Sequence, residues 1–514
     1  MGRTQKSVKN IAFGFGAQGV TTLIHFLTKS IIARMLGAQI VAMNGLFTEI
    51  IACLALAELG IGDAIVYNLY KPLAEDDHEK VSQLMTFFKQ AYRVIALAVL
   101  GMGTIACFFV QFLMKGSEIT YPMWFIRTIF MLFVVNSASS YLFSYKISLL
   151  YADQKAYLYS FYNTIFYVVR MAINIGVLFL VNRFGDAYSY IWYLSISIIT
   201  TLISNYLLSR QVDKRYTYLQ KIPLPKEGKK TVFDNVKNIF IKEVSGKITS
   251  STDNILISVL VSTIMVAPNQ FYITLTGVFK SLISQVETGI KASMGNLFAV
   301  GSVDDCKRVI NRLTWGYMAF SIWGCTGLFV CSESFISVWV GRQYLYSDMI
   351  LFTIILNLYC FIICRPIYTA MHVSGFFKEG RNISIAGSVV NLIVSIVFGK
   401  MWGIIGIFLG TFCTYLIQTI LKIYYVYKLK FKSSCADYGT RMTMYTVLLI
   451  ACMFGCKWLT GLYVIENDIL RFFVNGAVSS VVVIAVIVVL FARTAEFKYY
   501  FEMAKGITKK FKRK

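Results

Sequence analysis

Long apolar segments of about 20 residues follow one another along the whole chain, with short polar segments between them. A helix of that length crosses the hydrocarbon core of a bilayer. The pattern predicts an all-α polytopic membrane protein with about 14 transmembrane helices. Their expected ranges are 9–33, 43–67, 87–114, 122–145, 157–181, 188–209, 238–262, 268–290, 312–332, 348–373, 382–399, 403–427, 442–463 and 469–492.

One part of this pattern occurs twice. The segment 28–84 is similar to the segment 252–313, and Thr28 aligns with Thr252. A repeat of this length predicts two structurally similar halves. In a polytopic membrane chain, repeated halves usually enclose a substrate site between them.

The polar segments divide the predicted helices into larger parts. The longest polar segment, 211–237, is interpreted as a cytoplasmic linker between an N-terminal lobe (1–210, six spans) and a C-terminal lobe (238–432, six spans). Two further spans follow over 433–492. The tail 493–514 is basic with interleaved aromatic residues, which is typical of a helix lying on anionic lipid.

Composition agrees with a membrane protein. The chain is 57% hydrophobic and only 15% charged, with a mean hydropathy of +0.63, whereas a soluble domain carries about 25% charged residues. The net charge of +24 lies in the loops, which favours a topological role over nucleic-acid binding. The lack of a small-residue cleavage site indicates that the first apolar segment is retained as a helix.

No motif for catalysis, a metal or a cofactor is found. The 11 cysteines are dispersed, mostly inside apolar segments, and no Cys pair stands near His at ligand spacing. The sequence contains no phosphate-binding loop, no nucleophile elbow and no HExxH. We therefore expect no enzyme activity, no catalytic residues, no bound metal and no cofactor.

Positive charge sets the expected orientation. Most of the 50 Lys and Arg residues fall in segments on one side, among them Lys422 at the end of a span. Because positive loops mark the cytoplasmic face, both termini are expected inside. The few cations expected on the outer side are Arg34, Lys115, Arg183, Arg342, Lys400, Lys457 and Arg471.

A third group of cations falls inside predicted spans, where charge is costly and usually faces a partner or a wet cavity. Within five spans, polar residues recur at helical spacing along one face. For a single such face, hydrogen bonding between helices is the simpler explanation. For five faces we predict a shared polar cavity, and the excess of cations predicts an anionic ligand. The cations inside spans are Lys29, Arg93, Arg127, Arg170, Lys247, Lys280 and Arg365.

Four further residues bear on this cavity. Asp253 occupies the repeat position equivalent to Lys29, so an ion pair across the two halves is a hypothesis. His25 is a candidate for proton coupling, with ordinary packing as the alternative. Glu287 is positioned to neutralise nearby lysines. Pro366 is expected to kink its helix beside Arg365.

Several ordered segments carry a family resemblance. They are IIARMLGA (31–38), ALAELGIGDAIVYNLYKPLAEDD (55–77), STDNILIS (251–258), MGNLFA (294–299), RPIYTAMHVSGFFKEGRN (365–382) and VVNLIVSIVFGKMWGIIGIFLGTF (389–412). Together they resemble the polysaccharide transporter family, the Wzx-type oligosaccharide flippases of the multidrug/oligosaccharidyl-lipid/polysaccharide (MOP) exporter superfamily. The likeness covers nearly the whole chain and rests on the order of degenerate motifs.

The resemblance implies two pseudo-symmetric six-helix lobes in a V, two extra C-terminal helices, and a central cationic cavity. It implies a flippase in the bacterial plasma membrane that moves polyprenyl-pyrophosphate-linked glycan by alternating access, coupled to H+ or Na+. Polysaccharide polymerase and glycosyltransferases would be further partners. The implied substrate-binding cations are Lys29, Arg34, Arg170, Lys247, Lys280 and Arg365. The candidates for ion coupling are His25, Asp253 and Glu287.

Three alternatives remain open. A multidrug exporter of the same superfamily would show an acid-dominated cavity for cationic substrates. A flippase for lipid-linked peptidoglycan precursor would share the cationic cavity. A membrane glycosyltransferase or acyltransferase would place a carboxylate or His pair at an outer helix end.

Overall fold

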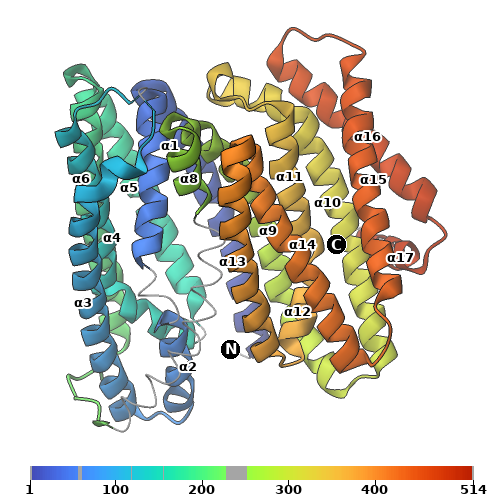
Figure 1. Cartoon of the computed structure of the whole chain (residues 1–514). Helices are drawn as coiled ribbons and strands as arrows, with labels where there is room; N and C mark the ends of the chain where they lie inside the picture. Colours follow the sequence, from blue (N-terminus) through green and yellow to red (C-terminus); the bar gives the residue numbers. More distant parts are fainter. Residues whose placement is uncertain (1–2, 56–60, 117–118, 154, 227–251, 512–514) are drawn as a thin grey trace. The chain divides into compact units, whose positions relative to one another are not determined.

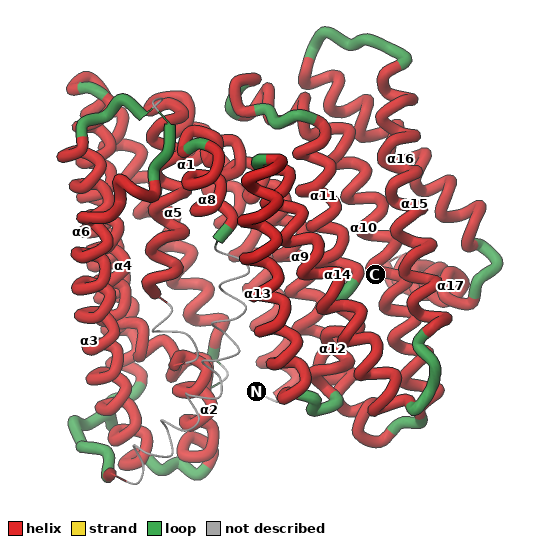
Figure 2. The backbone as a smooth tube through the Cα atoms, in the orientation of Figure 1, coloured by secondary structure: helices red, strands yellow, loops and turns green. Residues whose placement is uncertain are grey.

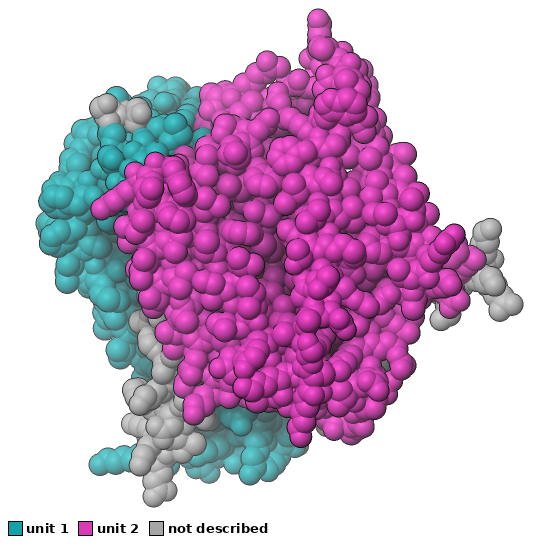
Figure 3. Space-filling model, turned by 45° about the vertical axis from the view of Figure 1, so that its right-hand side comes forward, with its two compact units in different colours: residues 1–270 teal, residues 271–514 magenta. Residues whose placement is uncertain are grey.

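The computed structural model describes residues 3–55, 61–116, 119–153, 155–226 and 252–511. These residues form helices and loops, and no strand occurs among them (Figure 2). The chain divides into two compact units, which Figure 3 colours teal and magenta. Unit 1 is residues 1–270, and unit 2 is residues 271–514.

Unit 1 is built mainly from long antiparallel helices (Figure 1). Asp77 begins α3 as an N-cap, since its side chain accepts a hydrogen bond from the Lys80 backbone N–H at 2.8 Å. The α-helices are α1 (Arg3–Leu54), α2 (Ile61–Ala74), α3 (His78–Phe109), α4 (Met123–Ala152), α5 (Ala156–Val181), α6 (Asp186–Arg215) and α8 (Asp253–Leu256). The short helices are η2 (Val110–Leu113), η3 (Asn182–Phe184), η4 (Ile257–Val261) and η5 (Thr263–Met265).

The repeat is visible as a break at the same place in both copies. Within α1, Gly37 has φ 77° and ψ −179°, a conformation that only glycine adopts readily, so α1 is two helices joined at this residue. The aligned residue in the second copy is Val261, where η4 ends. Ser262 is extended there, and the chain resumes as α9 (Val266–Val300), which continues into unit 2.

The first residues of the expected linker pack against unit 1. Tyr216 and Leu224 are buried in a cluster with residues of α2, α3 and α4. The Tyr216 hydroxyl donates to Asp153 at 2.6 Å, and the Tyr218 ring stacks on His78 at 3.9 Å. The remainder of the linker and most of the expected span 238–262 lie outside the described residues.

Unit 2 holds the remaining helices. In Figure 1 the orange helices α13 and α14 lie side by side, and a Cβ added at Gly406 would meet the Phe398 carbonyl oxygen at 1.9 Å. The α-helices are α10 (Val303–Trp339), α11 (Asp348–Ile363), α12 (Arg365–Val373), α13 (Phe377–Trp402), α14 (Ile404–Tyr425), α15 (Ala436–Gly461), α16 (Asp468–Phe491) and α17 (Ala495–Phe511). The short helices are η6 (Arg342–Tyr344) and η7 (Val426–Phe431).

Among the described residues, 11 helices are long and apolar enough to span a membrane. One of them, Gly16–Leu54, overlaps the expected spans 9–33 and 43–67 on either side of Gly37, and the second of these spans extends past Leu54. The expected span 268–290 is not among the 11, since polar residues interrupt α9. Large apolar side chains are exposed on the outer helix faces, such as Val489 at 80%. The chain is a multi-pass, all-helical membrane protein.

Candidate functional site

Unit 2 brings three cationic side chains onto two aromatic rings. The Arg365 guanidinium lies 3.7 Å from the centroid of the Phe361 ring, and the Lys280 ammonium lies 5.5 Å from the same centroid. The Lys422 ammonium lies 3.3 Å from the centroid of the Tyr368 ring. These five residues, from α9, α11, α12 and α14, are called the cationic cluster below.

A helix break positions Arg365. Helix α11 ends at Ile363, and α12 begins at Arg365 with Pro366 in its first turn. Proline has no backbone N–H to contribute and suits the first turn of a helix. The kink that the sequence predicted beside Arg365 is therefore confirmed. It leaves the Arg365 side chain 24% exposed at the start of a new helix.

One carboxylate faces the cluster. A carboxylate oxygen of Glu287 lies 3.6 Å from the Arg365 guanidinium, and its other oxygen accepts from the Thr369 hydroxyl at 3.2 Å. The Nε of Arg365 is buried with no hydrogen-bond partner in the structure. Such an arrangement suits the oxygens of phosphate or pyrophosphate.

Sequence analysis missed Lys422 because its charge was counted with the cytoplasmic segments. The structure instead buries this residue to 8% exposure. One turn earlier on α14, Gln418 accepts from the Tyr368 hydroxyl at 3.3 Å. A signal was available, since Thr411, Thr414, Gln418 and Lys422 follow the same helical spacing as the other polar faces.

Unit 1 contains a separate polar chain across α1, α5 and α6. The Tyr167 hydroxyl lies 3.5 Å from Nδ1 of His25, and the Tyr167 ring faces the Arg170 guanidinium at 5.3 Å. Arg170 also donates to the Thr201 hydroxyl at 3.1 Å. Two of the predicted residues, His25 and Arg170, are thus connected through one tyrosine.

The other predicted residues of unit 1 lie elsewhere. The Lys29 ammonium donates to the backbone oxygen of Gln270, near the start of α9, at 3.0 Å. Arg34 is exposed on α1, and Asp253 is half-buried at the start of α8. The Lys29–Asp253 ion pair stays a prediction. Lys247 lies outside the described residues.

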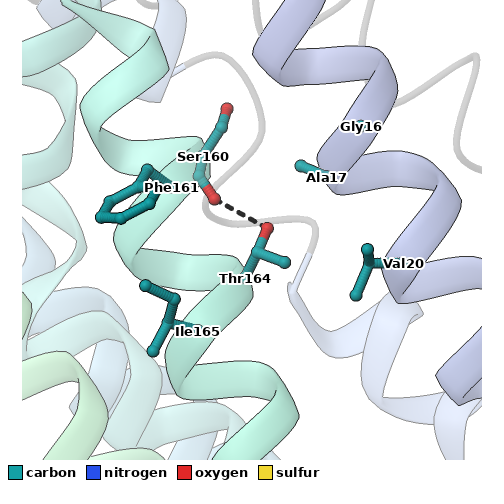
Figure 4. Close-up of a pocket in the computed structure, with 7 residues that line it drawn as sticks. All are labelled: Gly16, Ala17, Val20, Ser160, Phe161, Thr164 and Ile165. Carbon is teal, nitrogen blue, oxygen red and sulfur yellow. Dashed lines mark hydrogen bonds between the residues drawn. The ribbon is translucent and has the colours of Figure 1, made fainter.

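Each unit also has an apolar hollow. In unit 1, a pocket of about 370 Å³ lies between α1 and α5 (Figure 4). Its lining residues are Gly16, Ala17, Val20, Ser160, Phe161, Thr164 and Ile165. In unit 2, a groove of about 290 Å³ is lined by α9, α10 and α16, including Phe279, Trp323 and Phe472. Both hollows suit hydrocarbon rather than a charged group.

The structure thus groups Lys280, Arg365 and Glu287 in unit 2, and His25 with Arg170 in unit 1. The single cavity shared by both halves stays a prediction. Among the described residues, no group of three or more His, Cys, Asp and Glu could hold a metal ion.

Comparison with known proteins gives a fold and not a sequence family. No family model matches the chain, and no curated protein matches it. Several solved structures do match, and the three reported below are described as a flippase or as transporters.

Lipid II flippase MurJ, in an inward closed conformation, superposes with a TM-score of 0.71 at 16% identity, covering 94% of this chain and 100% of MurJ. An inward-facing multidrug resistance MATE family transporter of the MOP superfamily gives 0.61 at 13% identity, covering 80% and 96% of the two chains. The eukaryotic MATE transporter AtDTX14 superposes with a TM-score of 0.57 at 12% identity, covering 85% of this chain and 99% of AtDTX14. The chain therefore has the fold of MurJ and the MATE transporters.

Proposed function

We propose that this protein is a flippase that translocates polyprenyl-pyrophosphate-linked oligosaccharide repeat units across the bacterial plasma membrane, for surface polysaccharide biosynthesis. The cationic cluster of unit 2 holds the pyrophosphate and the first sugars. Alternating access of the two halves carries this headgroup across, and H+ or Na+ resets the transporter. Both termini are cytoplasmic in this proposal.

The observation that carries the proposal is the gathering of three cationic side chains around the rings of Phe361 and Tyr368. Within the cluster, Lys280 and Arg365 lie against Phe361, Lys422 lies against Tyr368, and Arg365 also pairs with Glu287. A transporter of lipophilic cations would repel its substrate here, because like charges in a medium of low dielectric constant interact strongly. A pyrophosphate group supplies the counter-charge and several acceptor oxygens.

The groove of unit 2 supports a lipid-linked substrate. Its walls from α9, α10 and α16 are apolar, and α9 also carries Lys280 and Glu287 of the charged region. A polyprenyl chain in or beside this groove stays in hydrocarbon while the headgroup contacts the cations. Each buried methylene of such a chain contributes about 0.8 kcal/mol.

A lipid-linked peptidoglycan precursor is the second candidate substrate. It is favoured by the similarity of the fold to a protein described as a lipid II flippase. It carries the same class of pyrophosphate headgroup, so the cationic cluster would serve it equally. The sugar composition of the headgroup distinguishes the two candidates.

The test is translocation in proteoliposomes. A fluorescent polyprenyl-pyrophosphate oligosaccharide is incorporated, and its outward movement is followed by quenching from one side. Wild type is expected to move it, whereas Lys280→Ala and Arg365→Ala are expected to lose most of the rate. Arg342→Ala is the matched control, because Arg342 is 69% exposed and lies outside the cluster.

Substrate choice is read in the same assay by competition. Oligosaccharide-linked lipid and peptidoglycan precursor are each added unlabelled, and the stronger competitor identifies the substrate class. If wild type moves neither lipid but binds lipophilic cations, the flippase proposal is wrong and the exporter alternative replaces it.

A further inference from the structure

A second charged feature lies in unit 1, between α5 and α6. Arg170 and Asn174 are four residues apart on α5, so both side chains lie on one face of that helix. The opposing helix contributes Thr200 and Thr201. All four residues belong to unit 1.

Two donors in this region have no acceptor in the structure. They are the Nε of Arg170 and the side-chain nitrogen of Asn174, and both atoms are buried. Asn174 as a residue is 0% exposed. A buried polar group without a hydrogen-bond partner destabilises the fold, and a charged group does so more strongly, so native proteins rarely leave one unpaired.

The neighbouring hydroxyls do not provide the missing acceptor. Thr200 lies 3.5 Å from the Asn174 side-chain oxygen, but its hydroxyl is 2.8 Å from the backbone oxygen of Ile196, which takes its proton. Thr201 already accepts from another nitrogen of Arg170 at 3.1 Å. The side-chain nitrogen of Asn174 therefore has no protein acceptor within hydrogen-bonding distance.

The charge of Arg170 also lacks a protein counter-charge among the described residues. The titratable groups that act on it are the phenols of Tyr159, Tyr167 and Tyr193, which are neutral at physiological pH. A cation at membrane depth is ordinarily paired or hydrated. Here a guanidinium lies beside two buried nitrogen donors that have no acceptor, Nε of Arg170 and the side-chain nitrogen of Asn174.

We propose that unit 1 binds a small inorganic anion, such as chloride, between α5 and α6. The anion accepts from Nε of Arg170 and from the Asn174 amide, and it neutralises the guanidinium. Water would satisfy one donor but would leave the charge uncompensated. This site is distinct from the cationic cluster, and the inference does not depend on which lipid the protein transports.

Location is tested with crystals of the full chain grown in bromide. The expected result is an anomalous bromide peak within hydrogen-bonding distance of Asn174 and Arg170. Ordinary water density with no anomalous peak at this place overturns the proposal.

Affinity is tested by thermal unfolding of the full chain in nanodiscs of neutral phosphatidylcholine, with gluconate replaced by chloride at constant ionic strength. The unfolding midpoint of wild type should rise with chloride and then saturate. Arg170→Gln should weaken the apparent chloride affinity roughly tenfold or more, as expected for the loss of a hydrogen bond to a charged group. Arg183→Gln is the matched control, because Arg183 is exposed beyond the end of α5.

A second variant keeps the test decisive if Arg170→Gln fails to fold. Asn174→Leu keeps the side-chain volume but removes the amide donor, so it should also weaken the chloride response. If both variants respond to chloride as wild type does, the site is not there. If the shift requires phosphatidylglycerol in the disc and not free anion, the ligand is a lipid phosphate and the proposal of a free anion is wrong.

Discussion

Replacing Lys422 with methionine separates transport from stability. The variant removes the ammonium from the cationic cluster but keeps an unbranched apolar side chain of similar length. Lys422 is 8% exposed and lies against the Tyr368 ring at 3.3 Å. Because the sequence pattern alone gave no role to this residue, the variant tests what the structure adds.

Two opposing terms set the effect on stability. A charged side chain at membrane depth costs about 2.5–3.5 kcal/mol, while a desolvated cation–π contact contributes about 2 kcal/mol or more. Because the substitution removes both terms, the free energy of unfolding should change by no more than about 1 kcal/mol. The unfolding midpoint of Lys422→Met should therefore lie within a few degrees of that of wild type.

Transport should respond much more strongly. If the ammonium of Lys422 contacts a phosphate oxygen of the substrate, its loss removes a charged hydrogen bond, worth about 1.5–3 kcal/mol. That energy corresponds to a roughly 10- to 150-fold lower rate at limiting substrate. Both quantities are measured on one preparation, by unfolding and by proteoliposome translocation. Normal translocation by a well-folded Lys422→Met protein would refute the assignment of this residue to the site.

Three further variants test the fold. Gly406→Ala should lower the free energy of unfolding by about 1–3 kcal/mol, because the added Cβ would overlap the backbone of α13. Gly455→Ala is the comparison: its Cβ would enter open space, so this variant should be neutral or slightly stabilising. Chemical unfolding measures both variants. Gly37→Ala should lower the free energy of unfolding by about 1–3 kcal/mol and straighten α1, because a residue with a Cβ is strained at the φ of 77° found there. The distance between two spin labels on either side of the break measures the change in shape. Burial and the hydrogen bond to Asp153 raise the pKa of Tyr216 above its ordinary value. The neutral phenol therefore stabilises the fold, and this contribution is lost progressively as pH rises above about 10. Tyr216→Phe should show a smaller alkaline loss in a pH series of unfolding midpoints.

Helix positions were predictable because their cause is local. Apolar length fixed most of the spans, and Pro366 marked the break between α11 and α12. The repeat predicted two similar halves, and the helices break at the aligned residues Gly37 and Val261. The sequence did not predict that the single residue Gly37 separates the first two helices, because the backbone conformation of one glycine has no hydropathy signal.

The candidate site was predictable only in part. Lys280, Glu287 and Arg365 were identified because a charge in the middle of an apolar segment is conspicuous. Lys422 was overlooked because a lysine near a span end ordinarily reaches the interface. Its burial depends on α12 lying against α14, which is a tertiary contact that helical periodicity does not encode.

The central claim is that the cluster around Phe361 holds the pyrophosphate of a lipid-linked glycan. The most direct measurement replaces Phe361 with a photoreactive phenylalanine and irradiates the protein in membranes with radiolabelled polyprenyl-pyrophosphate oligosaccharide. The account predicts labelling that unlabelled substrate and inorganic pyrophosphate suppress, and that Arg365→Ala abolishes. Labelling by bulk phospholipid alone, or by a lipophilic cation in preference to the glycan lipid, would contradict it.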